Sequence, residues 1–293
     1  MQVVVFGRTL KENDTTYVQT LMDVLQEEGI YVYIYRPYLE SLESDIRFRK
    51  DVGVFEGFLD FSVKKFDFVI TLGGDGTILD ATTFVRDSGV PIIGINLGRL
   101  GFLASIEKVK IKEAIRAIAK GMYWIDERSL LQLESNLPVF EDISFALNDC
   151  TLLKRETSSM ISTKVFINGD LLNTYWADGI IISTPTGSTG YSLSCGGPIV
   201  FPNSGNFVIT PVAPHNLNVR PIVISDDSVI SFELEGRSDN FLCTLDSRFE
   251  SITPQHQIAV RKADFTIKLA QLNDRSFLDT LKEKLVWGVD VRN

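Results

Sequence analysis

The first 124 residues alternate short apolar runs with amphipathic helical patterns, and this alternation constrains the fold more than any other feature of the chain. Strands that alternate with helices pair in parallel, because each helix carries the chain back to the same end of the sheet. The pattern predicts an α/β domain over residues 1–124 with a doubly wound, Rossmann-like parallel sheet. Its expected strands are Gln2 to Phe6, Ile30 to Tyr35, Phe66 to Leu72 and Pro91 to Ile95.

Helical spacing is clearest after the first of these strands. Val18, Leu21, Met22 and Leu25 follow the i, i+3, i+4, i+7 pattern, with Asn13 or Asp14 as the expected cap and Gly29 as the stop. Further helices are expected over Ile78 to Asp87 and over about Lys110 to Gly121. The less regular stretch from Pro37 to Ser62 is interpreted as a surface excursion of this domain.

From Trp124 onward, short β-rich runs replace the helical pattern. Asn168-Gly169 stands between two of them and is typical of a hairpin turn, because both residues tolerate positive φ. Residues 125–270 are therefore predicted to form an all-β domain, a layered sheet or sandwich. Residues 271–293 are expected to form a tail that packs on the first domain, helical over Ser276 to Leu285. The expected β-runs are Ile143 to Leu153, Lys164 to Ile167, Leu171 to Trp176, Ile180 to Ser183, Phe207 to Thr210, Val229 to Glu235, Phe241 to Leu245 and Phe265 to Leu269.

Net charge limits the kinds of partner that the chain can bind, and cysteine content indicates its cellular compartment. A net charge of −9 argues against a duplex nucleic acid as partner, because nucleic-acid binding depends on clustered Lys and Arg. No apolar stretch approaches the ~18 residues that a membrane span needs, and no secretory signal opens the sequence. Cys150, Cys195 and Cys243 are odd in number and far apart, which disfavours a disulfide framework. We expect a cytoplasmic protein without nucleic-acid or membrane partners.

A glycine-rich loop, Gly73-Gly74-Asp75-Gly76-Thr77, joins an expected strand to an expected helix. Backbone N–H groups and the helix dipole at such a turn suit phosphate oxygens. The loop matches neither the dinucleotide fingerprint nor the P-loop pattern, which weighs against a dehydrogenase or a P-loop ATPase. A plain turn capped by Asp75 is the structural alternative. A carboxylate beside phosphate is explained better by a general base or a magnesium partner, which indicates a kinase acting on a small alcohol.

A second polar segment, Trp176 to Pro198, carries Asp178-Gly179, a buried strand and a loop rich in Thr, Ser and Gly. Its hydroxyls could bind sugar hydroxyls and phosphates, and Tyr191 offers a flat face for a base. A plain connector is the alternative interpretation. Asn148-Asp149 is a third polar pair, at the centre of an apolar run whose interior disfavours both residues. The hydroxyl candidates are Thr184, Thr186, Ser188, Thr189 and Ser194.

Together these segments resemble the NAD kinases, which transfer the donor's terminal phosphate to the adenosine 2′-hydroxyl of NAD to give NADP. The resemblance covers nearly the whole chain. The glycine-rich loop alone also occurs in diacylglycerol-type lipid kinases, whereas the runs 96–103 (NLGRLGFL) and 183–189 (STPTGST) are specific to NAD kinases. The other matching segments are Asn148-Asp149, Asp178-Gly179, Gly196 to Pro198, Thr210 to His215 and Lys284 to Gly288.

The resemblance implies roles for individual residues. Asp75 would be the catalytic base that accepts the proton of the 2′-hydroxyl, and Asn148 and Asp149 would bind the adenosine part of NAD. ATP would be the phosphate donor, Mg²⁺ would enter with the nucleotide without a protein ligand of its own, and the chain would form a homodimer or homotetramer. The full set implied to bind substrate or nucleotide is Gly73, Gly74, Gly76, Thr77, Asn148, Asp149, Asp178, Thr186, Thr189, Gly190, Tyr191, Ser192, Leu193, Ser194, Ala213 and Arg248.

The chain departs from the family pattern at several of these positions. Asp149 stands where the family usually has Glu, Gly190 where it commonly has Ala, and Trp176 where many relatives carry Lys or Arg. Arg248 follows Asp246-Ser247 in place of the usual Gln, and it could replace the cation lost at Trp176. Two rival functions stay open at this point: a lipid kinase sharing the loop, and a non-catalytic regulator that binds NAD(H).

Overall fold

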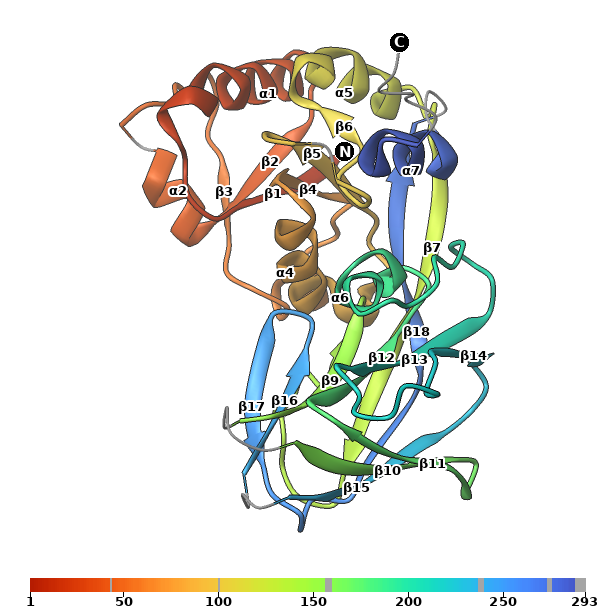
Figure 1. Ribbon diagram of the computed structural model, residues 1–293. Helices are drawn as coiled ribbons and strands as arrows, with labels where there is room; N and C mark the ends of the chain where they lie inside the picture. The colour runs from red at the N-terminus through yellow and green to blue at the C-terminus, as the bar shows by residue number, and fades with distance from the viewer. Residues whose placement is uncertain (43, 100, 156–159, 237–239, 273–275, 288–293) are drawn as a thin grey trace. The chain divides into compact units, whose positions relative to one another are not determined.

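The computed structural model describes residues 1–42, 44–99, 101–155, 160–236, 240–272 and 276–287. The chain divides into two compact units (Figure 1). The first unit comprises Met1–Glu127 together with the stretch from Ile267 onward, and the second comprises Arg128–Thr266.

The first unit is built on a parallel sheet in the order β3-β2-β1-β4-β5, with the end of β18 beyond β5. Val3 of β1 aligns with Val32 of β2 and with Phe68 of β4, and Val69 aligns with Ile92 of β5. All these pairs are parallel, so the predicted α/β domain with a parallel sheet is confirmed. The strands are β1 Gln2–Gly7, β2 Tyr31–Tyr35, β3 Gly53–Phe55, β4 Phe68–Gly73, β5 Ile92–Asn96, the short β6 Ile106–Glu107 beside β5, and β18 Ile258–Gln271.

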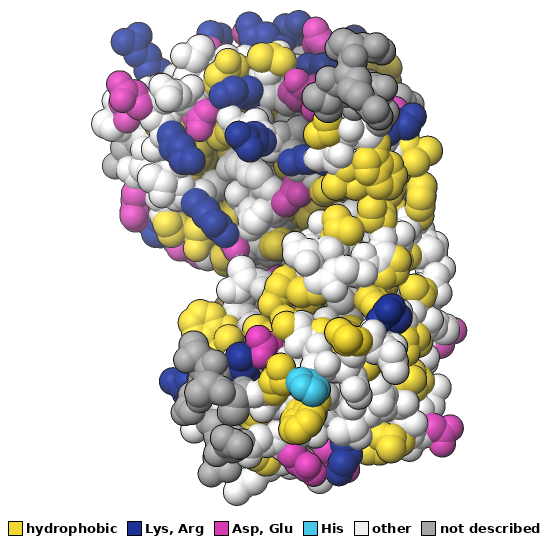
Figure 2. Space-filling model, in the orientation of Figure 1, with side chains coloured by type: hydrophobic (Ala, Val, Ile, Leu, Met, Phe, Trp, Pro, Cys, Tyr) yellow, Lys and Arg dark blue, Asp and Glu magenta, His cyan; other side chains and the backbone are white. Residues whose placement is uncertain are grey.

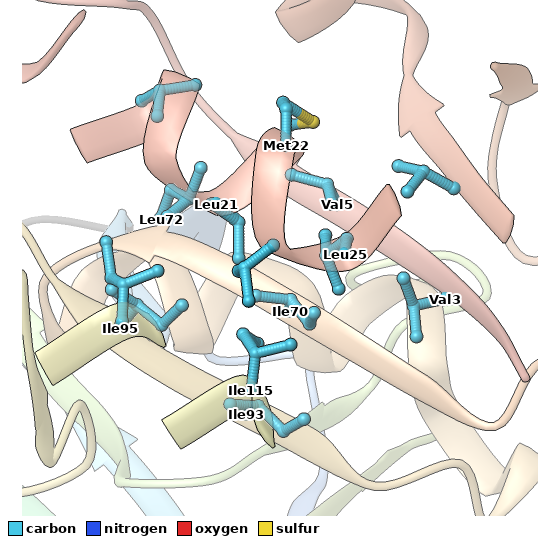
Figure 3. Close-up of a cluster of buried hydrophobic side chains, with 14 of the residues drawn as sticks. Val3, Val5, Leu21, Met22, Leu25, Ile70, Leu72, Ile93, Ile95 and Ile115 are labelled. Atoms are coloured by element: carbon cyan, nitrogen blue, oxygen red, sulfur yellow. The ribbon is translucent and has the colours of Figure 1, made fainter. Parts of the chain in front are cut away.

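Helices cover both faces of this sheet (Figure 1). Helix α1 (Thr15–Glu27) and helix α5 (Ile111–Ala119) pack together on one face, and α4 (Asp75–Val85) contacts β1, β4 and β5. Figure 3 shows how alternate strand residues pack against α1 and α5. The labelled cluster joins Leu21, Met22 and Leu25 of α1 and Ile115 of α5 to Val3, Val5, Ile70, Leu72, Ile93 and Ile95 of the strands.

The start of α1 differs from the prediction, although its apolar face and its stop at Gly29 (φ +69°) agree with it. Asn13 lies in a 3₁₀ turn, Glu12–Asp14, and Asp14 occupies the N-cap position without a side-chain capping bond. The Asp14 carboxylate instead pairs with Lys108 at 3.4 Å. The cap expected from the residue type is therefore replaced by a tertiary ion pair.

The interpretation of Pro37 to Ser62 as a surface excursion is wrong. This stretch contains α2 (Arg36–Leu42), the edge strand β3 and α3 (Asp60–Val63). Tyr38, Leu42, Ile46 and Phe55 are almost completely buried, and the first three belong to the same core cluster as α1. Its elements are too short to show a period, so the sequence pattern does not reveal them.

The second unit is antiparallel and has two sheets, as the predicted all-β layered arrangement requires. Six strands run in the order β14-β13-β12-β9-β16-β17, and β11-β10-β15-β18 form the other ladder. Asn168 and Gly169, with φ of 52° and 90°, close the hairpin between β10 and β11. The bounds are β9 Asp149–Lys154, β10 Ile161–Ile167, β11 Asp170–Ala177, β12 Gly179–Ser183, β13 Asn206–Val212, β14 Ile222–Ser225, β15 Ile230–Glu235, β16 Phe241–Leu245 and β17 Arg248–Ile252.

Three features of this unit differ from the predicted runs. The run Ile143 to Leu153 is interrupted, with β8 at Phe145–Ala146 and β9 beginning at Asp149. Strands β14, β17 and the long β7 (Trp124–Ser135) were not predicted. Polar residues break the apolar alternation of β7 and β17, and β14 has only four residues. The loop after β12 contains a 3₁₀ turn at Gly187–Thr189 and the short helix α6 at Tyr191–Ser194.

The end of the chain belongs to the first unit. Helix α7 (Phe277–Leu285) begins with a capping box between Ser276 and Asp279, and Phe277 lies 6.1 Å from Phe102, ring centre to ring centre. Within the described residues, no helix combines the length and apolar character that crossing a membrane would require.

Candidate active site

The strand order of the first unit reverses between β1 and β4. The chain moves outward from β1 to β2 and β3, then returns to β4 and continues to β5 on the other side. Open α/β sheets bind ligands beyond the carboxyl ends of the strands at such a switch point. The Gly73 to Thr77 loop follows β4 there, and Arg8 follows β1.

The glycine-rich loop is largely the first turn of helix α4. The helix begins at Asp75, three residues before the predicted start at Ile78, with Gly74 in extended conformation at the N-cap. Gly76 is exposed, Gly73 and Gly74 are half-buried, and Thr77 is buried with its N–H donating to the Gly74 carbonyl at 3.0 Å. The first turn of a helix presents N–H groups and positive potential, so this loop is suited to phosphate.

Asp75 is not an ordinary helix cap, because its carboxylate binds a different loop. Its Oδ2 accepts the N–H of Phe102 at 2.7 Å, and its Oδ1 accepts the N–H groups of Leu103 and Ala104 at 3.1 and 3.0 Å. A carboxylate offers about four lone-pair directions. The hydrogen bonds found among the described residues occupy three of them, which leaves one on Oδ2 for a further proton donor.

Gly101 makes this arrangement possible. A Cβ at this position would lie 1.8 Å from Asp75 Oδ1 and 2.4 Å from Asp75 Cγ. Asn96 shapes the same loop: its side chain accepts from Gly98 N–H at 2.7 Å and donates to the Arg99 carbonyl at 2.6 Å. Residues 96–104 therefore form a cradle for the Asp75 carboxylate, although Leu100 of this run lies outside the described residues.

Arg8 was not predicted from the sequence. Its Nε donates to the Asp80 carboxylate at 2.6 Å and its Nη2 to the Gly76 carbonyl at 3.4 Å. Among the described residues, its remaining N–H groups meet no partner, and the side chain is 61% exposed. Its place directly after the first strand of a doubly wound sheet is the signal that could have identified it. Lys and Arg side chains are also prominent over the face of the first unit drawn in Figure 2.

In the second unit, Asn148 and Asp149 lie at the break between β8 and β9. Asn148 is half-buried and Asp149 is 8% exposed. The Asp246 carboxylate accepts the N–H groups of residues 147, 148 and 149. The pair therefore lies at an interruption between two strands, held by these hydrogen bonds, rather than at the centre of one strand. Burial, and then the nearby charge of Asp246, raise the pKa of Asp149 to about 7.

Asp178 lies just before β12, whose last residue, Ser183, aligns with Asp149, so Asp178 and Asp149 stand at opposite ends of this strand. Burial chiefly raises the pKa of the Tyr191 hydroxyl, and the charges of Cys195, Asp149 and Asp178 add to the effect. Asp178 forms an ion pair with Lys154 at 2.6 Å. The charges of Asp149 and Asp178 thus both reach Tyr191, although these two carboxylates lie at opposite ends of β12.

The hydroxyl-rich segment is mostly turned inward. Thr184 donates to the Leu147 carbonyl at 2.6 Å, Ser188 to the Pro185 carbonyl at 2.7 Å, and Ser192 pairs with Thr210 at 2.8 Å. Thr186 is buried and accepts from Arg128 at 3.1 Å. Most of these hydroxyls therefore hold the loop together. Gly190, Tyr191 and Ser194 are exposed, and Thr189 and Leu193 are half-buried.

Ala213 and Trp176 lie at exposed positions. Ala213 has a φ of +44°, and His215 donates its backbone N–H to the Trp176 carbonyl at 2.8 Å. The Trp176 and His215 rings meet edge to face at 5.5 Å. Trp176 thus packs against His215 on the surface of the second unit.

Arg248 binds backbone carbonyls of its own unit, whereas the sequence suggested that its charge would serve the ligand. Its guanidinium donates to the backbone carbonyls of Ile143 and Phe145, and it lies 5.8 Å from the ring centres of Phe140 and Phe145. The side chain thus stabilises the segment that precedes the break at Asn148.

Over the described part of the chain, no group of three or more His, Cys, Asp or Glu side chains is placed to bind a metal ion. Cys150 and Cys243 are buried and Cys195 half-buried, all with free thiols.

The fold and the site define a two-part nucleotide-binding protein, with a carboxylate in a glycine-rich loop at the switch point of a doubly wound sheet. The family model for the ATP-NAD kinase N-terminal domain matches residues 3–123, and the model for the ATP-NAD kinase C-terminal domain matches residues 147–272. The chain belongs to the ATP-NAD kinase family.

Curated relatives match over their full length. The chain is 45% identical to an NAD kinase of Cytophaga hutchinsonii over 288 residues, 98% of both proteins. It is 42% identical to NAD kinases of Flavobacterium psychrophilum and Bacteroides fragilis, with complete coverage of both chains in each case.

Two solved structures share the fold. One is a yeast NADH kinase complexed with NADH, with a TM-score of 0.88 and 22% identity over 100% of this chain and 89% of that chain. The other is an NAD kinase from Archaeoglobus fulgidus in complex with ATP, with a TM-score of 0.73 and 24% identity over 98% and 99%. At these identities the likeness concerns the fold alone.

Proposed function

We propose that this chain is an NAD kinase that transfers the terminal phosphate of ATP to the 2′-hydroxyl of the adenosine ribose of NAD. The observation that carries the proposal is the carboxylate of Asp75 in the glycine-rich loop, which accepts the backbone N–H groups of residues 102–104 and keeps one lone pair of Oδ2 available. Family membership and full-length similarity to NAD kinases support it.

Asp75 acts as the general base in this proposal. The 2′-hydroxyl oxygen attacks the terminal phosphorus of ATP and forms the new O–P bond, while its proton passes to Oδ2 of Asp75. The bond from that phosphorus to the bridging oxygen breaks, and ADP leaves. Phosphoryl transfer asks the protein mainly for positioning and charge stabilisation, so a base fixed by three hydrogen bonds suits the task.

The first unit also supplies the donor's phosphate contacts. We assign the phosphates of ATP to the start of α4, at Gly73, Gly74, Gly76 and Thr77, with Arg8 as an added cation. Three N–H groups of Arg8 remain for phosphate oxygens beside its bonds to Asp80 and Gly76. Magnesium, bound mostly by phosphate and water oxygens, neutralises phosphate charge when the nucleotide is present.

The second unit supplies the recognition of NAD. Asn148 and Asp149 are assigned to the adenosine part, together with Asp178 and the exposed residues of the segment after β12. Thr186, Ser192 and Arg248 contribute through the loops that they hold. The remaining contacts are assigned to Thr189, Gly190, Tyr191, Leu193, Ser194 and Ala213.

The experiment that tests this function is an assay of the purified protein with magnesium, ATP and NAD. We expect NADP as product. Phosphorylation of diacylglycerol in vesicles without NADP formation would favour the lipid kinase, and NAD binding without turnover would favour a regulator. We further propose a cytoplasmic homodimer or homotetramer, which light scattering after gel filtration distinguishes from a monomer.

A further inference from the structure

Asp246 lies in the turn between β16 and β17, outside the residues assigned to the ligand. Its backbone adopts φ +54°, in the left-handed region that residues other than glycine rarely occupy. The neighbouring strands pair in regular register from Leu245 with Arg248 onward. The unusual backbone therefore belongs to the turn itself and directs the Asp246 side chain.

The Asp246 carboxylate binds three successive backbone amides. Oδ2 accepts the N–H of Leu147 at 2.9 Å, and Oδ1 accepts those of Asn148 at 2.7 Å and Asp149 at 3.3 Å. In return, the Asp246 N–H donates to the Asp149 carbonyl at 3.0 Å. Four hydrogen bonds thus join this turn to the break between β8 and β9.

The carbonyl groups of the same break are bound from the segment after β12. Thr184 donates through Oγ1 to the Leu147 carbonyl at 2.6 Å and through its N–H to the Asn148 carbonyl at 2.9 Å. A Cβ on Gly187 would lie 2.1 Å from the Asn148 carbonyl oxygen. The backbone of Asn148 and Asp149 is therefore held on both sides, and within the described part of the chain the side-chain bonds to its amides come from Asp246.

This arrangement places two acidic side chains beside each other in a buried environment, which is unfavourable for both when charged. Burial is the main cause of the raised pKa of both carboxyl groups. For Asp246, the amides of residues 147–149 and the charge of Arg248 oppose that shift. An uncharged turn would avoid this cost but would leave the amides of residues 147–149 without these acceptors, so the carboxylate is retained for the backbone that it holds. We infer that Asp246 is a positioning residue, which fixes the backbone of Asn148 and Asp149 so that their side chains meet the dinucleotide acceptor.

This inference rests on the proposed assignment of Asn148 and Asp149 to NAD. The variant Asp246→Asn keeps the size of the side chain but replaces one acceptor oxygen with a donor, which must face a backbone N–H. We expect the KM for NAD to rise roughly 10-fold, the factor that corresponds to about 1.4 kcal/mol and to the loss of one hydrogen bond to a charged acceptor. The kcat and the KM for ATP should stay within about twofold, because no ATP or transfer contact is assigned to this turn.

Asp227→Asn is the matched control, since Asp227 is an exposed acidic residue of another turn in the same unit. It should leave all three kinetic constants unchanged. If Asp246→Asn fails to fold, Asp246→Glu decides, because it keeps the charge and displaces it by one methylene. A KM for NAD that is raised with unchanged kcat supports the inference, and an unchanged KM overturns it.

Asn148→Ala and Asp149→Asn separate this inference from the function on which it rests. If both raise the KM for NAD while Asp246→Asn does not, the positioning role is wrong and the acceptor site stands. If neither raises it, the assignment of this pair to NAD fails and the positioning role fails with it. In the double variant Asp246→Asn/Asn148→Ala, the two effects should be less than additive, since they act through one contact.

Discussion

Replacing Asp75 with Asn tests both roles of this side chain, as base and as anchor of residues 102–104. The amide oxygen of Asn can accept two of the three N–H groups that Asp75 now binds, but its NH₂ group then faces the third. An amide also cannot take a proton from the attacking hydroxyl. The variant therefore removes the base and weakens the loop in one step.

The two effects have different magnitudes. Loss of one hydrogen bond to a charged acceptor costs about 2 kcal/mol of unfolding free energy, which lowers Tm by about 4–8 °C in a protein of this size. Loss of general-base catalysis lowers kcat by about 10²–10⁴-fold. NAD binding should change little, because the residues assigned to its recognition, other than Asp75 itself, belong to the second unit.

The assay couples NADP formation to an NADP-dependent dehydrogenase and measures kcat and both KM values, with a thermal melt beside it. Asp87→Asn, an exposed carboxylate just beyond α4, serves as the control and should change neither kcat nor Tm. A folded Asp75→Asn variant with kcat within a few-fold of the native protein would refute the base role. An unchanged Tm would refute the anchoring role.

Four further outcomes are expected from the contacts and charges of the two units. Gly101→Ala places a methyl group 1.8 Å from Asp75 Oδ1, so it should lower kcat at least as strongly as an uncharged Asp75 and lower Tm in a thermal melt. Arg8→Ala should raise the KM for ATP roughly 5–10-fold with little change in the KM for NAD, as expected for one charge-assisted contact in steady-state kinetics. Because the pKa of Asp149 is raised to about 7 and ribose hydroxyls donate best to its ionised form, the KM for NAD should rise as pH falls from about 8 to 6. Asp149→Asn should abolish that dependence, and an identical pH profile in the variant would exclude Asp149 as its source. The same raised pKa should make stability fall as pH rises from about 4 to about 7, since the unfolded chain releases this proton first.

Much of the fold was predictable because its long elements repeat a simple period. The α1 residues Val18, Leu21, Met22 and Leu25 are fully buried, as the helical spacing requires. The short elements α2, β3 and α3 contain too few residues to show any period, so their sequence resembles that of a surface excursion. Burial of Tyr38 and Phe55 in that stretch follows from tertiary packing, which no local pattern contains.

The candidate site was predictable in position and less so in its contacts. The glycine-rich loop was expected between strand and helix, and it lies there. Its partner amides at residues 102–104 are distant in sequence, and so are the amides at 147–149 that Asp246 binds. Backbone groups at an interruption between two strands need other hydrogen-bond partners, because buried N–H and C=O groups are costly when unpaired. Thr184 satisfies that need, so a hydroxyl that looked available for a ligand is already used.

In each unit, an Asp carboxylate thus accepts hydrogen bonds from three backbone amides of a loop. The two carboxylates differ in whether an oxygen atom remains accessible to a ligand. Asp75 starts a helix in a half-buried loop, where the helix dipole stabilises its negative charge. Asp246 is enclosed beside Arg248 and Asp149, and burial raises its pKa although three amides and Arg248 oppose the shift. The first environment leaves an oxygen available to a substrate hydroxyl, whereas the second directs the same kind of carboxylate toward the backbone. Environment rather than residue type therefore distinguishes the proposed base from the proposed positioning residue, and the contrast between the kcat effect of Asp75→Asn and the KM effect of Asp246→Asn measures that distinction.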